Sequence, residues 1–161
     1  MNSSLFSHAP REPEPSKSAD PVHCRVTVPR ESQEAFSGFT DLIHLWWPVD
    51  RQSVAGEGSH VEFEDHVLTE TTLDDEVHVW GEILEWTPGS HLRCTWHPGT
   101  SPGASGEVDL DFVDVGDGRT EVRLTHSGWE NMPEGGRERV AYADGWPQVL
   151  ARYVRFMGGT A

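Results

Sequence analysis

An alternation of apolar and polar side chains between residues 58 and 127 constrains the fold of this chain more than any other feature. In the stretch HLRCTW, for example, Leu92, Cys94 and Trp96 fall on one face. Such alternation is typical of β-strands that bury one face. The sequences TPGS and GDG lie between consecutive strands, and each favours a tight hairpin. Strands joined by hairpins predict an antiparallel sheet with one apolar face.

Segments with helical spacing flank these strands. An alternating strand at residues 22–28 precedes residues 31–47, where apolar residues recur every three or four positions and predict two short helices. The same spacing predicts one long helix from Arg137 to about Met157. The expected apolar face of this long helix comprises Val140, Ala143, Trp146, Leu150, Tyr153 and Met157.

Pro147 lies inside the predicted long helix. Because proline removes one backbone hydrogen bond, we expect the helix either to bend near residues 143–145 or to restart as a segment capped by Asp144. The position of Pro147 should therefore set how far the end of this helix stands from the sheet.

These patterns together predict an α+β fold. We expect a curved antiparallel sheet of about six or seven strands, wrapped around the long C-terminal helix, with two short helices after the first strand. A chain of 161 residues suits one domain, which we place at residues 21–158. Residues 1–20 are rich in proline, serine and charge and are expected to form a disordered leader.

Charge and cysteine usage limit the partners and the compartment. The chain has 27 acidic and 12 basic residues, a formal net charge of −15, which disfavours nucleic acid and anionic membrane surfaces as partners. No apolar run is long enough to span a membrane, and the N-terminal residues lack the apolar core of a secretion signal. Cys24 and Cys94 belong to no CxxC pair, so we expect a reducing, cytoplasmic location.

Four segments carry a resemblance to a known family. These are FTDLIHLWWP, WGEILEWTPGSHLRCTW, VRLTHSGWE and GWPQVLARY, and the similarity spans roughly residues 22–157. The chain resembles the single-domain bacterial relatives of the Hsp90 ATPase activator, within the START-like (SRPBCC) superfamily. This resemblance implies a helix-grip fold with a cavity between the sheet and the long helix. It also implies binding of lipids, plant hormones, aromatic polyketides or related apolar molecules, and in a minority of members a cyclisation or dehydration activity.

The candidate ligand-binding residues are those that the periodicity places on inward faces. They are Trp47, Phe63, Trp96, Leu110, Phe112, Leu124, His126, Trp146, Leu150 and Tyr153. A concave sheet crossed by one helix is a usual place for a ligand pocket, although the same rings could equally be ordinary core packing. Asp65 is also placed inward, on the face of Val61 and Phe63.

His126 and Asp65 are the candidate catalytic residues if the protein is an enzyme. An imidazole and a carboxylate inside an apolar cavity could orient a ligand or act on it as acid and base. The alternative is that His126 lies at a strand end and bonds to the backbone. Strict alternation places Trp80 and Trp86 on the outer sheet surface, unless a β-bulge intervenes. An exposed aromatic pair there would mark a contact surface such as a homodimer interface.

Motifs for metal and nucleophilic chemistry receive no support. The chain contains no HExxH or CxxC spacing, and His60 and His66 are expected on the surface, so we expect no metal and no cofactor. The stretch GTSPG matches GxSxG, but a strand rather than a helix follows it, which excludes a nucleophile elbow.

The leading hypothesis is a cytoplasmic domain that binds a small apolar ligand, aromatic or lipid-like, between the sheet and the C-terminal helix. The second is a cyclase or dehydratase that uses the same cavity. The third is a protein-interaction module of the Hsp90-activator type. The eukaryotic activators carry a separate N-terminal domain for their partner, where this sequence has residues 1–20.

Overall fold

The computed structural model describes residues 19–160, and the predicted leader therefore lies almost wholly outside the described residues. The first half of the domain contains β1 (Val22–Val28), α1 (Ser32–Phe39), α2 (Ile43–Trp46), β2 (His60–Glu64), β3 (Val67–Thr71) and β4 (Val77–Thr87). The second half contains β5 (His91–Trp96), the short 3-10 helix η3 (Pro102–Ala104), β6 (Gly106–Gly116), β7 (Arg119–Ser127), the 3-10 helix η4 (Trp129–Asn131) and α3 (Gly135–Phe156).

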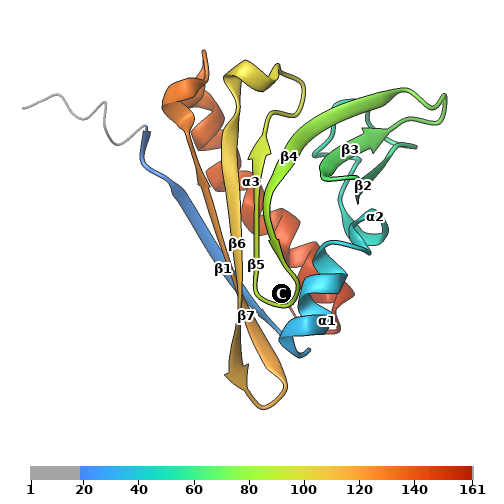
Figure 1. Cartoon of the computed structure of the whole chain (residues 1–161), viewed down its shortest axis with the longest axis vertical. Helices are drawn as coiled ribbons and strands as arrows, with labels where there is room; N and C mark the ends of the chain where they lie inside the picture. The colour runs from blue at the N-terminus through green and yellow to red at the C-terminus, as the bar shows by residue number, and fades with distance from the viewer. Residues whose placement is uncertain (1–18, 161) are drawn as a thin grey trace, which may run out of the picture.

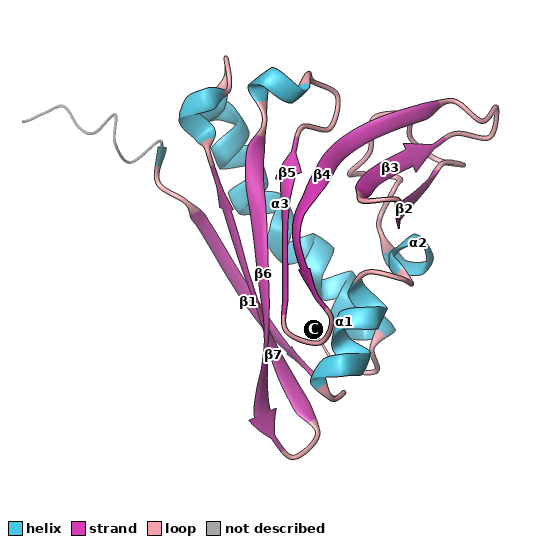
Figure 2. Ribbon diagram, viewed as in Figure 1, coloured by secondary structure: helices cyan, strands magenta, loops and turns pink. Residues whose placement is uncertain are grey.

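The seven strands form one antiparallel sheet in the order β1-β7-β6-β5-β4-β3-β2 (Figure 1). The sheet curls, and α3 runs along one of its faces (Figure 2). Strands β1 and β2 lie at opposite edges of the sheet, and α1 and α2 connect them. The following strands lead back across the sheet until β7 pairs with β1. The predicted α+β helix-grip architecture is confirmed.

Local sequence explains the hairpins. Gly89, in the turn between β4 and β5, has a φ of 79°, and Gly118, between β6 and β7, has a φ of 70°. Residues with a Cβ rarely adopt these left-handed conformations, which is why glycine occupies both turns. No helix among residues 19–160 is long and apolar enough to cross a membrane.

Strand β4 departs from simple alternation, and this overturns one prediction. Its pairing with β3 shifts register opposite Leu68 and Thr69, and its pairing with β5 shifts between Ile83 and Glu85. An extra residue at such an irregularity moves the following side chains to the other face. Trp80 is therefore 1% exposed in the core, and the prediction that it lies on the outer surface is wrong.

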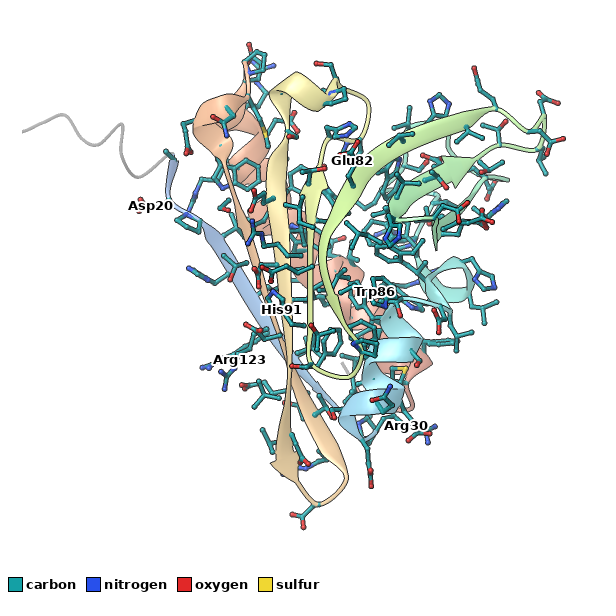
Figure 3. All side chains as sticks on the ribbon, in the orientation of Figure 1. Asp20, Arg30, Glu82, Trp86, His91 and Arg123 are labelled. Carbon is teal, nitrogen blue, oxygen red and sulfur yellow. The ribbon has the colours of Figure 1, made fainter. Side chains whose placement is uncertain are left out.

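The predicted outward position of Trp86 is also wrong. Trp86 pairs with Leu92, a core residue of β5, and its ring centroid lies 5.2 Å from that of Phe36 in α1 and 5.7 Å from that of Phe63 (Figure 3). It is packed at the rim of the inner face and 37% exposed. An exposed tryptophan pair for a homodimer interface is thus not formed.

Helix α3 begins two residues earlier than predicted and continues through Pro147 without a second segment. Four of the six residues predicted for its apolar face, Trp146, Leu150, Tyr153 and Met157, are buried, and the prediction is wrong only for the first turns of the helix. Val140 is 66% exposed and Ala143 is exposed, whereas Tyr142 turns inward and packs against the core. The hydroxyl of Tyr153 donates a hydrogen bond of 2.6 Å to the carbonyl oxygen of Ala35, which ties α3 to α1.

Candidate functional site

The interior between the sheet and α3 is filled by aromatic rings. Among them are the indoles of Trp47, Trp96 and Trp146, whose ring centroids lie 5.3 to 6.1 Å apart. A space of only about 10 Å³ remains among them, about enough for one water molecule. The prediction of vacant hydrophobic volume under the helix is therefore wrong, because the tryptophan side chains themselves occupy it.

Most of the predicted ligand-binding residues are core residues. Trp47, Phe63, Trp96, Leu110 and Trp146 line the small residual space. Phe112, Leu124, Leu150 and Tyr153 are at most 5% exposed and line neither this space nor the pockets described below. Only Trp47 and Trp96 of the predicted set also reach an open pocket.

Two pockets flank the contact between Trp96 and Tyr142. The first, which we call the outer pocket, has a volume of about 160 Å³. It is lined by Trp96, His97, Pro98, Thr100, Ala104, Met132, Pro133, Glu134, Glu138 and Tyr142. The second, the tryptophan pocket, has a volume of about 150 Å³. It is lined by Trp47, Arg51, Gln52, Ser53, Val54, Trp80, Trp96, Pro98 and Tyr142.

The two pockets adjoin, because Trp96, Pro98 and Tyr142 line both. The Trp96 indole Nε1 donates a hydrogen bond of 3.1 Å to the Tyr142 hydroxyl, and this contact separates them. We refer to the outer pocket and the tryptophan pocket together as the groove. Trp96 also borders the residual space in the core, so its ring lies between the groove and the interior.

His97 supplies polar groups to the outer pocket. It directly follows β5 and is 4% exposed, yet neither ring nitrogen has a hydrogen-bond partner among the described residues. Buried polar atoms almost always have partners, so an unsatisfied imidazole in a pocket wall is a candidate contact for a ligand. A neutral imidazole offers one donor and one acceptor.

His126 is fully buried, as its strand periodicity predicted. Its Nδ1 accepts a hydrogen bond of 3.0 Å from the Trp146 indole, which leaves the proton on Nε2. Nε2 itself has no partner in the described part of the chain. Burial lowers the pKa of His126 to about 3, so the ring is neutral near pH 7.

Met132 and His126 both approach Gly106, at the start of β6. A Cβ built on Gly106 would lie 2.6 Å from Met132 Cε and 3.5 Å from His126 Nε2, so both atoms border the space that this glycine leaves open. Met132 also lines the outer pocket. Met132 is thus a residue of the outer pocket that also lies near the neighbourhood of His126.

Asp65 is not part of this site, and its predicted inward position is wrong. Strand β2 ends at Glu64, so the alternation that starts at Val61 does not reach Asp65. Asp65 instead occupies the turn before β3, where it is exposed and has a φ of 51°. The proposed acid–base pair of His126 and Asp65 is therefore not assembled.

Glu70 is a buried carboxylate that the sequence analysis missed. It accepts hydrogen bonds from the backbone N–H groups of Val54 and Ala55, at 2.8 and 3.1 Å, and from the Trp80 indole at 3.2 Å. The Ser59 hydroxyl also donates to it. Burial acts to raise the pKa of Glu70, but these hydrogen bonds outweigh burial and hold the pKa below its usual value. Glu70 thereby fixes the segment that forms one wall of the tryptophan pocket.

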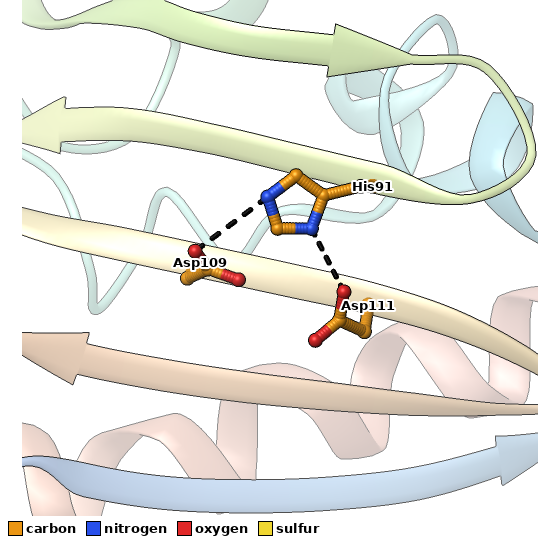
Figure 4. Close-up of side chains that lie close together, drawn as sticks. All are labelled: His91, Asp109 and Asp111. Carbon is orange, nitrogen blue, oxygen red and sulfur yellow. Dashed lines mark hydrogen bonds and ion pairs between the residues drawn. The ribbon is translucent and has the colours of Figure 1, made fainter.

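The outer face of the sheet carries a cluster of His91, Asp109 and Asp111 (Figure 4). Their ligand atoms lie within 4.8 Å of one another, close enough to surround a metal ion. However, both ring nitrogens already face carboxylates, with Nδ1 at 2.8 Å from Asp111 and Nε2 at 2.9 Å from Glu85. This arrangement suits an imidazolium. Partial burial would lower the pKa of His91, but the hydrogen bond to Asp111 and the neighbouring negative charges raise it overall.

Comparison with known families identifies the chain. The family described as "Activator of Hsp90 ATPase homolog 1-like protein" matches residues 31–157. The chain belongs to this family. The match covers α1 to α3 and so includes every residue of the groove. No functionally curated protein matches the sequence.

Solved structures similar to this family member confirm the fold. An anthrahydroquino-gamma-pyrone synthase, Txn09, solved in a complex, is 28% identical, with a TM-score of 0.60 over 84% of this chain and 96% of that one. CalC from Micromonospora echinospora, described as a self-sacrificing resistance protein, is 24% identical, with a TM-score of 0.62 over 87% and 95%. The protein MLL2253 from Mesorhizobium loti is 18% identical, with a TM-score of 0.60 over 84% and 94%.

Most residues of the groove were not predicted, among them Tyr142, His97 and Met132, and of these three only Tyr142 had a detectable signal in the sequence. Tyr142 precedes Trp146 by four residues, which is the spacing of one helix face. His97 follows the inward-facing Trp96 directly at the end of a strand, where alternation stops being informative. Met132 lies in a loop, and nothing in its local sequence indicates a position beside His126.

Proposed function

We propose that this protein binds a small apolar molecule, aromatic or lipid-like, in the groove beside Trp96 and Tyr142. The observation that carries the proposal is the outer pocket, which combines mostly apolar walls with the unsatisfied nitrogens of His97. Small-molecule sites are typically concave and apolar with a few polar groups that fix orientation. The site thus lies at the surface end of the aromatic core rather than in its centre.

The family relationship supports this proposal. Proteins with this fold commonly bind small apolar ligands. The synthase Txn09, 28% identical to this chain, is named for a polycyclic aromatic product and was solved in a complex. The groove of this protein is bordered by four aromatic side chains, those of Trp47, Trp80, Trp96 and Tyr142. Flat aromatic rings would pack against these faces.

A second candidate function is catalysis on the same bound molecule. The observation that favours it is His126, whose Nε2–H is buried and unsatisfied and lies near Gly106, which Met132 of the outer pocket also approaches. A neutral imidazole held in this tautomer could donate a hydrogen bond to a carbonyl or enolate oxygen of a substrate. His126→Ala should then abolish turnover, whereas in a binding protein it should only weaken retention of the ligand.

The binding proposal is tested with the neutral fluorescent probe N-phenyl-1-naphthylamine. We expect saturable binding by the wild-type protein, with one probe per chain. Ala104→Trp should reduce the affinity at least about tenfold, because the new side chain fills the outer pocket that Ala104 lines. The matched control is Ser101→Trp, which adds the same ring to the same loop at an exposed position that does not line the pocket.

The affinities of these two variants show whether the probe binds in the outer pocket. Equal affinities for Ala104→Trp, Ser101→Trp and the wild type would show that the probe binds elsewhere. Absence of saturable binding to the wild type, for this probe and for a panel of other aromatic and acyl probes, would overturn the proposed function.

A further inference from the structure

A third pocket adjoins the groove where the last turns of α3 meet the segment that follows α2. This arginine pocket has a volume of about 320 Å³, larger than the outer pocket or the tryptophan pocket. It is lined by Pro48, Asp50, Arg51, Gln52, Gln148, Val149, Ala151, Arg152 and Arg155. Its lining is polar where that of the outer pocket is apolar.

The charge of this pocket is opposite to that of the chain. Arg51, Arg152 and Arg155 place three positive charges around it, against the single carboxylate of Asp50. The chain as a whole has 27 acidic and 12 basic residues, so a quarter of its positive charge lines one pocket. Guanidinium groups bind carboxylates and phosphates with paired hydrogen bonds, which makes an anion the expected occupant.

Structural roles account for only part of this arrangement. Arg155 lies in the last turn of α3, where a positive charge interacts favourably with the helix dipole. Arg51 lies 3.8 Å from Asp50 and 3.5 Å from the side-chain oxygen of Gln148. Arg152 and Arg155 form no ion pair with any residue in the range 19–160. Both arginines are exposed, so their guanidinium groups are accessible to an anion from solution.

The arginine pocket and the groove share two lining residues. Arg51 and Gln52 line both the arginine pocket and the tryptophan pocket. The backbone oxygen of Gln52 accepts a hydrogen bond of 2.6 Å from the Trp47 indole, which holds this segment against the aromatic core. A molecule whose rings occupy the tryptophan pocket therefore already lies beside Arg51, and an arm that extends past Arg51 would lead toward Arg152 and Arg155.

We propose that Arg51, Arg152 and Arg155 form an anion subsite, and that the ligand of the groove carries a carboxylate or phosphate on a short arm attached to its apolar body. This inference deepens the proposed function and rests on it for the apolar part of the ligand. The anion offsets the positive charge of the pocket, and the three arginines fix the end of the molecule relative to Trp47 and Tyr142.

The test compares 4-(1-naphthyl)butyric acid with its primary amide, which has the same shape and no charge, by isothermal titration calorimetry. We expect the acid to bind the wild-type protein about tenfold more tightly than the amide at low salt, with the difference shrinking as salt screens the charges. The double variant Arg152→Gln/Arg155→Gln should remove this difference and leave the affinity for the amide unchanged. The matched control, Arg119→Gln, removes an exposed arginine of the β6–β7 hairpin and should preserve the difference.

Two results separate this inference from the proposed function. If the acid and the amide bind the wild type equally, the anion subsite is wrong and the apolar groove stands. If neither naphthyl compound nor the probes of the binding test bind, the groove proposal fails, and binding of inorganic phosphate then decides whether the anion subsite exists.

Phosphate binding is followed by nuclear magnetic resonance of the arginine Nε–Hε groups. We expect the signals of Arg152 and Arg155 to shift saturably with added inorganic phosphate while the signal of Arg119 does not. Phosphate that competes with the acid, but not with the amide, would show that one subsite accepts both a free anion and the anionic arm of an organic ligand. Uniform shifts of all arginine signals, or none, would overturn the subsite.

Discussion

At the scale of single residues, the surroundings of His126 and His91 shift the pKa values of these two side chains in opposite directions. His126 is enclosed by Trp96, Trp129, Tyr142 and Trp146, and burial alone keeps it neutral. His91 lies on the outer face among carboxylates that favour its charged form. The difference follows from the positions of the two residues in their strands, because His126 faces the inner side of β7 and His91 faces the outer side of β5.

The surroundings of His91 predict a pH-dependent stability. Its folded-state pKa is raised, so its contribution is fully present below the unfolded-state pKa of about 6.5 and is lost as the pH rises through the folded-state pKa. We expect His91→Gln to lower the free energy of unfolding by up to about 1 kcal/mol near pH 6 and by much less near pH 9, since its partners are partly exposed. Urea unfolding of both proteins at the two pH values measures this, and a loss that is equal at both would contradict the assignment.

At the scale of elements, strand β4 determines where the aromatic core ends. It is long and strongly bent, and its two register shifts bring Trp80 and Trp86 to the inner side (Figure 1). The bend depends on close contact between β4 and β5. A Cβ on Gly81 would lie only 1.8 Å from the carbonyl oxygen of Thr95, so only glycine fits there.

Because of this contact, the addition of a single methyl group at position 81 should strongly destabilise the protein. We expect Gly81→Ala to lower the free energy of unfolding by about 3 kcal/mol or more, because the backbones of β4 and β5 must separate. The control is Gly103→Ala in η3, where the nearest atom to an added Cβ would be 4.0 Å away. Equal urea midpoints for the two variants would show that β4 accommodates the side chain without moving.

The strands could be predicted from the sequence because alternation and turn residues act locally. The hairpins at TPGS and GDG and the inward positions of Trp96 and His126 follow directly from these patterns. The shifts in β4 could not be predicted, because they depend on which residues of β3 and β5 face it. Asp65 was misplaced for a related reason, since alternation gives no sign that a strand has already ended.

At the scale of the whole molecule, the resemblance to a helix-grip fold predicted the architecture but not the location of the open space. Side-chain volume decides that location. Four tryptophans, Trp47, Trp80, Trp96 and Trp146, fill the interior that other arrangements of smaller side chains would leave empty. The accessible space lies instead in the groove, at one end of the tryptophan cluster. Besides Trp80 and Trp96, the groove is lined by residues from loops and from the first half of α3.

The most direct test of the groove uses the methionine methyl groups, because the sequence contains only three methionines. Met132 lines the outer pocket, whereas Met157 packs against Gly38 at the far end of α3. Protein labelled with ¹³C in the methionine methyl groups is titrated with N-phenyl-1-naphthylamine and followed by ¹H–¹³C correlation spectra. We predict that the Met132 signal shifts saturably at one probe per chain while the Met157 signal stays in place. An unchanged Met132 signal under saturating probe, or equal shifts of both signals, would contradict a ligand-binding groove beside Trp96 and Tyr142.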